Sequence, residues 1–213
     1  GNSSAASAVG PSSSDAARAG ALRASGGPNG GNSAKSGYIY AQNSAAAALG
    51  NDYFFYVSTS TATGNVTFPT FNPSTYSTLN ASWLANSTSF GSGSVFFAIQ
   101  LNGSAWYVTT TSYRTATSPS LDLLNLSWRS VTLSTAGADT LSYNTLSSST
   151  SSALFGPSDS ITGVGFYIDD MPVPPSGLVT YRIDDLLISD IPETSTSLLG
   201  LIGFSALAFR RKK

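Results

Sequence analysis

The 213-residue chain contains no cysteine and no histidine. Without cysteine it can form neither a disulfide nor a thiol nucleophile, and without both residues it lacks the usual zinc ligands. The absence of histidine also excludes every catalytic triad that depends on an imidazole base. Glutamate is almost absent, because Glu193 is the single example in the chain. A catalytic site built on two glutamates is therefore excluded as well.

Charged residues are few and unevenly placed. They make up 10% of the chain, and the formal net charge is −1. Between Tyr38 and Glu193, three arginines stand against ten acidic residues, which gives this stretch a net charge of −7. Binding to nucleic acid needs a basic face that neutralises phosphates. We therefore expect no nucleic-acid partner.

The composition divides the chain into three parts. Residues 1–36 are mostly Ser, Ala, Gly and Asn with almost no large apolar side chain. Such a segment cannot bury enough surface to offset the entropy of ordering it. We expect a flexible leader that can add one edge strand, followed by a folded domain at 37–190 and a C-terminal segment at 191–213.

The residue pattern of the middle part is typical of an antiparallel β-sandwich. Short runs rich in aromatic and β-branched residues recur between Gly, Asn, Ser and Pro breaks, which is the signal of strands. The expected strands are residues 37–42, 52–60, 64–69, 76–85, 94–101, 104–111, 128–134, 161–169 and 178–189. This pattern predicts an all-β, jelly-roll-like sandwich with a short C-terminal hydrophobic helix.

Three local features refine this expectation. The run VFFAI at 95–99 is apolar in both phases, which predicts a central strand covered on both faces. Asn102-Gly103 between two expected strands predicts a tight hairpin. Residues 120–128 form the one internal segment whose periodicity suggests a helix.

The chain ends in a short apolar segment followed by four cations. Leu198–Phe209 would span about 18 Å as a helix, and Arg210, Arg211, Lys212 and Lys213 follow it directly. A core-packing terminal helix is one interpretation. An apolar run followed by a cationic block is instead typical of a membrane stop signal, short but usable in a thinned bilayer. We expect this tail to engage a membrane.

The tail resembles a PEP-CTERM sorting segment. Pro192-Glu193-Thr194-Ser195-Thr196 matches the tripeptide and the Ser/Thr residues after it, except that Thr194 stands in place of the second proline. The Leu/Gly/Ala-rich stretch and the basic end follow at the usual spacing. The resemblance implies processing by an exosortase, a membrane enzyme that releases such proteins toward the outside of Gram-negative-type bacteria. It also implies transient anchoring in the inner membrane before display at the surface.

A sortase signal is the alternative. Ile191-Pro192-Glu193-Thr194 also resembles the LPxTG motif of Gram-positive surface proteins, but Ser195 stands where that motif has its glycine. The apolar run is also shorter than in that family. Both resemblances imply export and surface display.

The acidic residues of the middle part do not suggest catalysis. Asp169-Asp170 and Asp184-Asp185 are adjacent pairs, and neighbours on a strand point to opposite faces. Neither pair is therefore an acid–base couple by itself, and we predict that the chain is not an enzyme. Glycan hydrolysis stays open as an alternative if Asp169 or Asp184 lies within about 9 Å of a second acidic residue in a cleft.

The last two expected strands resemble those of carbohydrate-binding and laminin-G-like jelly rolls, which end in a strand of the form found at Arg182–Leu186. The resemblance implies a structural calcium ion bound at Asp184 or Asp185. Asp is also the one plentiful supplier of the hard oxygen ligands that calcium prefers. The alternative is a surface pair at a strand bulge that contacts Arg182 or a loop amide.

The resemblance further implies sugar binding on exposed aromatic rings with polar neighbours. The main candidates are Trp106, Tyr107, Tyr113, Arg114, Tyr38 and Tyr40, and Trp83 and Trp128 with Arg129 are further ones. Trp106 and Tyr107 alternate in direction, so one of the two should face solvent or the edge of a concave sheet. Core packing is the alternative for each ring.

The sequence therefore predicts an exported, non-enzymatic protein of a bacterial envelope, extracellular matrix or biofilm. The expected partners are an exosortase-type enzyme and an extracellular polysaccharide. A structural scaffold without a discrete ligand remains open, because a Ser/Thr/Asn/Gly-rich chain with few charges suits that role equally well.

Overall fold

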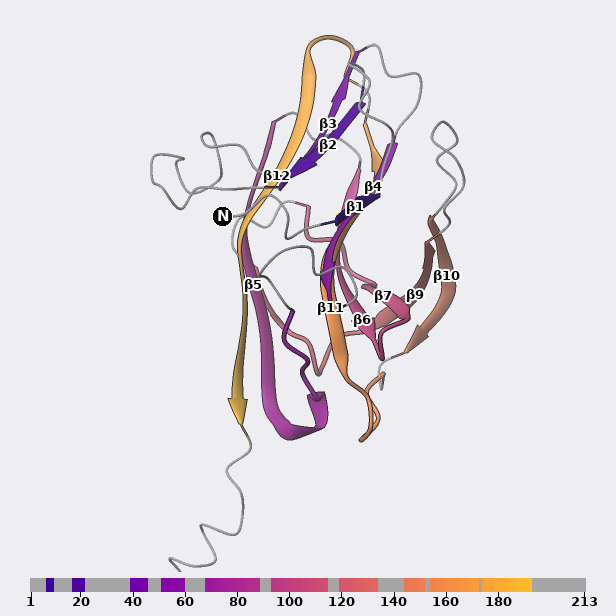
Figure 1. Ribbon diagram of the computed structural model, residues 1–213. Helices are drawn as coiled ribbons and strands as arrows, with labels where there is room; N and C mark the ends of the chain where they lie inside the picture. The colour runs from indigo at the N-terminus through magenta and orange to yellow at the C-terminus, as the bar shows by residue number, and fades with distance from the viewer. Residues whose placement is uncertain are drawn as a thin grey trace, which may run out of the picture.

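The computed structural model describes residues 7–9, 17–21, 39–45, 51–59, 68–88, 93–114, 119–133, 144–151, 154–172 and 174–192. Within these ranges the chain is all-β, with one 3-10 turn at Pro73–Thr75. The strands form two sheets in which every pair is antiparallel. The prediction of an antiparallel β-sandwich is thereby confirmed (Figure 1).

The two sheets differ in size. The seven-stranded sheet has the order β1 (Ser7–Val9), β4 (Asn51–Ser58), β11 (Ile161–Met171), β6 (Ser94–Leu101), β7 (Ala105–Thr109), β9 (Trp128–Leu133) and β10 (Asn144–Ser151). The five-stranded sheet has the order β2 (Ala17–Ala21), β3 (Ile39–Ser44), β12 (Leu178–Pro192), β5 (Tyr76–Thr88) and β8 (Ser120–Asp122). β1 and β2, which come from the first 36 residues, each form one edge of a sheet. The expected C-terminal helix at 198–209 lies outside the described residues.

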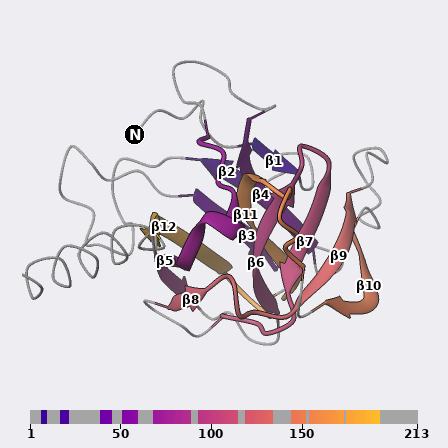
Figure 2. The same cartoon turned by 90° about the horizontal axis from the view of Figure 1, so that it is seen from below.

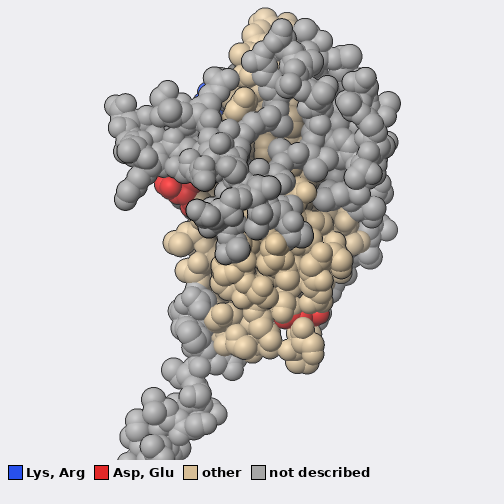
Figure 3. All heavy atoms as spheres, viewed as in Figure 1, with Lys and Arg blue, Asp and Glu red and all other residues tan. Residues whose placement is uncertain are grey.

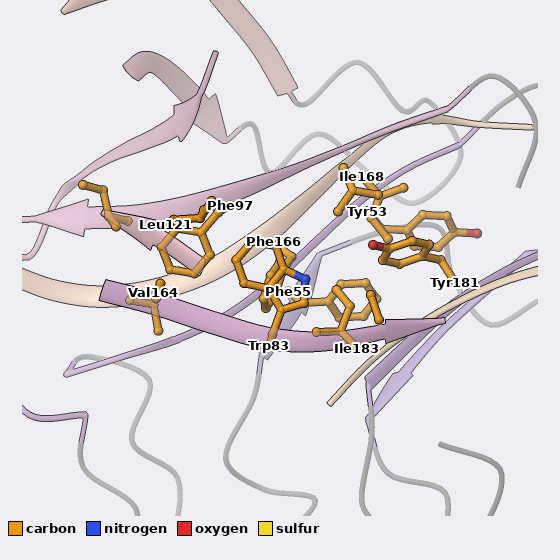
Figure 4. Close-up of a cluster of buried hydrophobic side chains, with 14 of the residues drawn as sticks. Tyr53, Phe55, Trp83, Phe97, Leu121, Val164, Phe166, Ile168, Tyr181 and Ile183 are labelled. Atoms are coloured by element: carbon orange, nitrogen blue, oxygen red, sulfur yellow. The ribbon is translucent and has the colours of Figure 1, made fainter. Parts of the chain in front are cut away.

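Large aromatic side chains hold the two sheets together (Figure 4). Trp83 of β5 stacks on Phe97 of β6 with ring centroids 5.5 Å apart and 11° between planes. It also meets Phe166 of β11 edge-on at 5.0 Å. These contacts join β5 of the five-stranded sheet to β6 and β11 near the middle of the seven-stranded sheet, so the core depends on Trp83.

The hairpin predicted at Asn102-Gly103 is confirmed. Both residues have positive φ, 53° and 74°, and Ser104 donates its backbone N–H to the Leu101 carbonyl. The helix considered for residues 120–128 is wrong. β8 occupies the start of this segment, and Asp122 then accepts hydrogen bonds from the Leu124 backbone and the Asn125 side chain, which turns the chain. A local side-chain bond of this kind competes with helix formation.

β6 is buried on both faces from Val95 to Leu101, as the sequence predicted. Phe97 and Ile99 point into the core between the sheets, whereas Phe96 and Ala98 belong to a separate cluster. A strand buried on both faces implies that apolar side chains also pack together on the side of the seven-stranded sheet opposite the core.

Candidate functional site

The outer face of the seven-stranded sheet carries a second hydrophobic cluster, here named the outer-face cluster. Its members are Phe54, Tyr56, Phe96, Ala98, Trp106, Val108, Val131 and Tyr167. Tyr56 is half-buried and the others are buried. An antiparallel sheet that packs one face on a core usually has polar residues on its other face. The aromatic cluster departs from this pattern, and Tyr56 is its one ring that remains partly accessible.

Two glycines of β11 allow β4 and β11 to approach closely on this face. Figure 2 shows that the seven-stranded sheet is curved, with β7, β9 and β10 turned away from the five-stranded sheet, so that the outer face is concave. At Gly165 a Cβ atom would lie 2.2 Å from the Phe55 carbonyl oxygen, and at Gly163 it would lie 2.7 Å from the Ser58 Cβ. The close approach of β4 and β11 therefore requires glycine at both positions.

Aromatic rings from β4 and from β7 meet on this face. Tyr56 on β4 and Trp106 on β7 are three strands apart in the sheet, a distance of about 14 Å at ordinary strand spacing. Their ring centroids are nevertheless 5.2 Å apart, with 69° between planes, and Phe54 meets Trp106 edge-on at 4.9 Å. Phe54 and Trp106 thus support Tyr56, the one half-buried ring of the cluster.

A group of polar side chains borders the cluster at Tyr167. The Tyr167 ring stacks on Phe96 at 6.1 Å, while its hydroxyl lies 3.0 Å from Asp52 Oδ2 and 3.2 Å from Asp169 Oδ1. The two carboxylate oxygens can therefore be no more than 6.2 Å apart. A second acidic residue does lie within 9 Å of Asp169, but both carboxylates are already hydrogen-bonded to the Tyr167 hydroxyl.

The environment of this group disfavours ionisation. Burial raises the pKa of Asp52 above its ordinary value of 3.8, although hydrogen bonds from the Asp170 backbone and Tyr167 oppose it. Burial also raises the pKa of Asp169, and the hydrogen bond from Tyr167 and, to a smaller extent, the charge of Arg129 oppose that effect. The nearby charge of Asp170 raises both pKa values further.

These raised pKa values predict how stability depends on pH. A carboxyl group with a raised folded-state pKa stabilises the fold below 3.8, and this contribution is lost as pH rises through the folded-state pKa. We expect Asp169→Asn to make the decline in the free energy of unfolding with rising pH shallower, because its amide cannot ionise. Urea unfolding between about pH 3 and 7 measures this. An equally steep decline in the variant would contradict the assignment.

The ligand-binding residues predicted from the sequence do not share one surface. Trp106 lies in the outer-face cluster, whereas Tyr107 and Tyr113 pack against the core on the other side of the sheet. Arg114 donates to the Gly93 carbonyl at 3.3 Å. Tyr40 lies on β3 of the five-stranded sheet, where it pairs with Arg182. Tyr38 lies outside the described residues.

The two aspartates predicted to bind calcium lie at a β-bulge. The register of β12 against β5 shifts between Asp184 and Leu187, and Asp185 has a φ of 50°. Asp184 is buried, its Oδ1 accepts from the Asp185 backbone N–H, and its Oδ2 is buried without a hydrogen-bond partner. Burial is the main cause that raises the pKa of Asp184. A buried orphan oxygen suits a cation ligand, but the described residues contain no group of three or more acidic side chains that could hold a metal.

The segment that resembles a sorting motif begins inside the fold. Pro192 is the last residue of β12 and pairs with Tyr76 of β5. Glu193, Thr194, Ser195 and Thr196 lie outside the described residues, as do Arg210, Arg211, Lys212 and Lys213, and Figure 3 draws all residues of this kind in grey. In the part of the chain that is described, no helix is long and apolar enough to cross a membrane.

Comparison with known proteins gives little further information. No family model and no curated protein matches the chain. One solved structure similar to it is the xyloglucanase domain of NopAA, a type three effector from Sinorhizobium fredii, in complex with cellobiose. The identity is 10%, the match covers 71% of this chain and 92% of that chain, and the TM-score is 0.28. A likeness of this degree carries no conclusion about fold or function.

Proposed function

We propose that the chain is a non-enzymatic polysaccharide-binding protein of the jelly-roll-like kind, and that its ligand binds on the concave outer face. The observation that carries this proposal is the outer-face cluster with Tyr56 as its half-buried ring. The apolar face of a pyranose stacks on an aromatic ring, and its hydroxyls bond to polar groups beside that ring. By strand alternation Asp52 shares this face with Tyr56, Asp169 with Tyr167 and Arg129 with Val131, and they supply acceptors and a donor.

The support for Tyr56 makes it the best platform on this face. A stacking ring binds more tightly when its orientation is fixed before the ligand arrives, because less entropy is lost on binding. Trp106 meets the Tyr56 ring edge-on at 5.2 Å between centroids, and Phe54 contacts it at 5.4 Å with 38° between planes. The binding role therefore belongs to Tyr56, and Trp106 acts as its positioning residue.

Affinity electrophoresis of the full chain against a panel of polysaccharides tests this function, with calcium and with chelator. Retardation by at least one polymer supports the proposal. Retardation lost on chelation would favour the calcium site proposed at Asp184 and Asp185. No retardation on any polymer would contradict binding and favour the structural scaffold.

We further propose export through the C-terminal segment, as its resemblance to PEP-CTERM segments implies. Thr194→Pro completes the proline-glutamate-proline tripeptide, whereas Ser195→Gly completes the rival sortase motif. In a host with an exosortase, we expect Thr194→Pro to increase release of the protein from the membrane fraction relative to the parent chain. A gain with Ser195→Gly in a sortase-bearing host, and none with Thr194→Pro, would favour the sortase alternative.

Glycan hydrolysis is the second candidate function. Its supporting observation is the separation of at most 6.2 Å between oxygens of Asp52 and Asp169, since paired carboxylates in glycosidases are about 5 to 9.5 Å apart. Both carboxylates are already hydrogen-bonded to the Tyr167 hydroxyl, which is why we place binding first. Release of reducing ends, abolished by both Asp52→Asn and Asp169→Asn, would reverse this order.

A further inference from the structure

The hairpin between β6 and β7 contains a chemically labile dipeptide. In Asn-Gly the small glycine lets its backbone nitrogen approach the side-chain amide of the asparagine. The Gly103 nitrogen, once deprotonated, can attack Asn102 Cγ, and the bond from Cγ to Nδ2 then breaks with loss of ammonia. Water opens the resulting succinimide to aspartate or isoaspartate. This deamidation requires no enzyme or co-reactant other than water.

Each reacting group of this dipeptide is hydrogen-bonded to the segment that leads into β11 or to the first residues of that strand. The Gly103 backbone N–H donates to Thr162 Oγ1 at 2.8 Å. Asn102 Nδ2 donates to Asp159 Oδ1 at 2.8 Å, and Asn102 Oδ1 accepts from the Ser160 backbone N–H at 3.0 Å. To react, the nitrogen must leave Thr162 and the amide must turn away from two partners.

The acceptor for the amide is itself held in place. Asp159 Oδ2 accepts from the Gly156 backbone N–H at 2.6 Å. The bond from Asn102 and then that from Gly156 lower the pKa of Asp159. The carboxylate therefore stays charged at neutral pH and keeps its hold on the Asn102 amide.

We propose that the segment 156–162 protects Asn102 from deamidation in the folded protein, and that the Thr162 hydroxyl is the main protecting group because it binds the attacking nitrogen. Loss of this protection has a structural consequence. Deamidation would put a carboxylate where the amide nitrogen now stands, 2.8 Å from an oxygen of Asp159. Like charges at this distance repel, so the hairpin that leads to Trp106 would loosen.

The rate of deamidation in the folded and the unfolded chain tests the protection. The full chain is incubated at mildly alkaline pH with and without urea, and the mass increase at Asn102 is followed by proteolysis and mass spectrometry. Asn29-Gly30 is the same dipeptide in the same chain and gives the intrinsic rate in urea. In urea we expect Asn102 to deamidate at the same rate as Asn29. In the folded chain we expect the rate at Asn102 to be lower by roughly tenfold or more. Equal rates at Asn102 with and without urea would overturn the proposal.

Two variants test the role of Thr162. Thr162→Val removes the hydroxyl and leaves the Gly103 N–H without its acceptor, whereas Thr162→Ser keeps the hydroxyl. We expect faster deamidation of Asn102 in folded Thr162→Val, with the rate of the parent chain retained in Thr162→Ser. The same rate in both variants, with folding checked by urea unfolding, would show that Thr162 does not protect. The comparison with urea tests the protection even if Thr162→Val fails to fold.

Discussion

Gly165→Ala should destabilise the protein by about 3 kcal/mol or more, or prevent it from folding. The added Cβ would lie 2.2 Å from the Phe55 carbonyl oxygen and 3.0 Å from the Tyr56 Cβ. Backbone cannot turn aside as a flexible side chain can, so β4 and β11 would have to separate. The substitution would therefore disturb the pairing that places Tyr56 on the outer face.

Gly163→Ala is the matched comparison, because the same strand meets β4 there with less overlap. Its Cβ would lie 2.7 Å from the Ser58 Cβ and 2.9 Å from the Val57 carbonyl oxygen. We expect a smaller loss in the free energy of unfolding, measured by urea unfolding for both variants. A Gly165→Ala variant as stable as the parent chain would show that β4 and β11 do not approach this closely.

Trp106→Ala should cost about 3 to 5 kcal/mol of stability, as truncation of a buried tryptophan usually does. Trp106 is 7% exposed and is in edge contact with both Phe54 and Tyr56. Its removal opens a cavity on the concave face and frees the Tyr56 ring. We therefore expect weaker retention on polysaccharide as well, even at temperatures where the variant remains folded.

Trp106→Phe separates these two effects, since it keeps a ring near Tyr56 and removes less volume. It should lose less stability than Trp106→Ala and retain part of the binding. Urea unfolding and affinity electrophoresis of the three proteins measure both properties. A loss below about 1 kcal/mol in Trp106→Ala would contradict the buried position of the ring.

Most central strands followed from the sequence, because their apolar runs have the length and residue types of strands. β6 was predicted with the bounds that the structure has, since both phases of VFFAI are apolar. β10, by contrast, has the sequence NTLSSSTS, and β1 and β2 consist mainly of small residues. These strands lack the local signal and depend on their partners in the sheet.

The outer-face cluster was not predicted, although the run DYFFYV is aromatic in both phases and could have indicated two covered faces. Which rings meet depends on the order β4-β11-β6-β7, and the sequence does not reveal strand order. The pair Asp52 and Asp169 was missed for the same reason. Asp169 was compared with its neighbour Asp170, whereas its partner across Tyr167 is more than a hundred residues away.

The most direct test of the central claim is the retention of Tyr56→Ala and Tyr56→Phe on a polysaccharide that retards the parent chain. Tyr56 is half-buried, so both variants should fold, which urea unfolding verifies. If the concave outer face binds glycan through this ring, Tyr56→Ala loses retardation and Tyr56→Phe keeps most of it. Full retardation of folded Tyr56→Ala would place the ligand elsewhere and contradict the account.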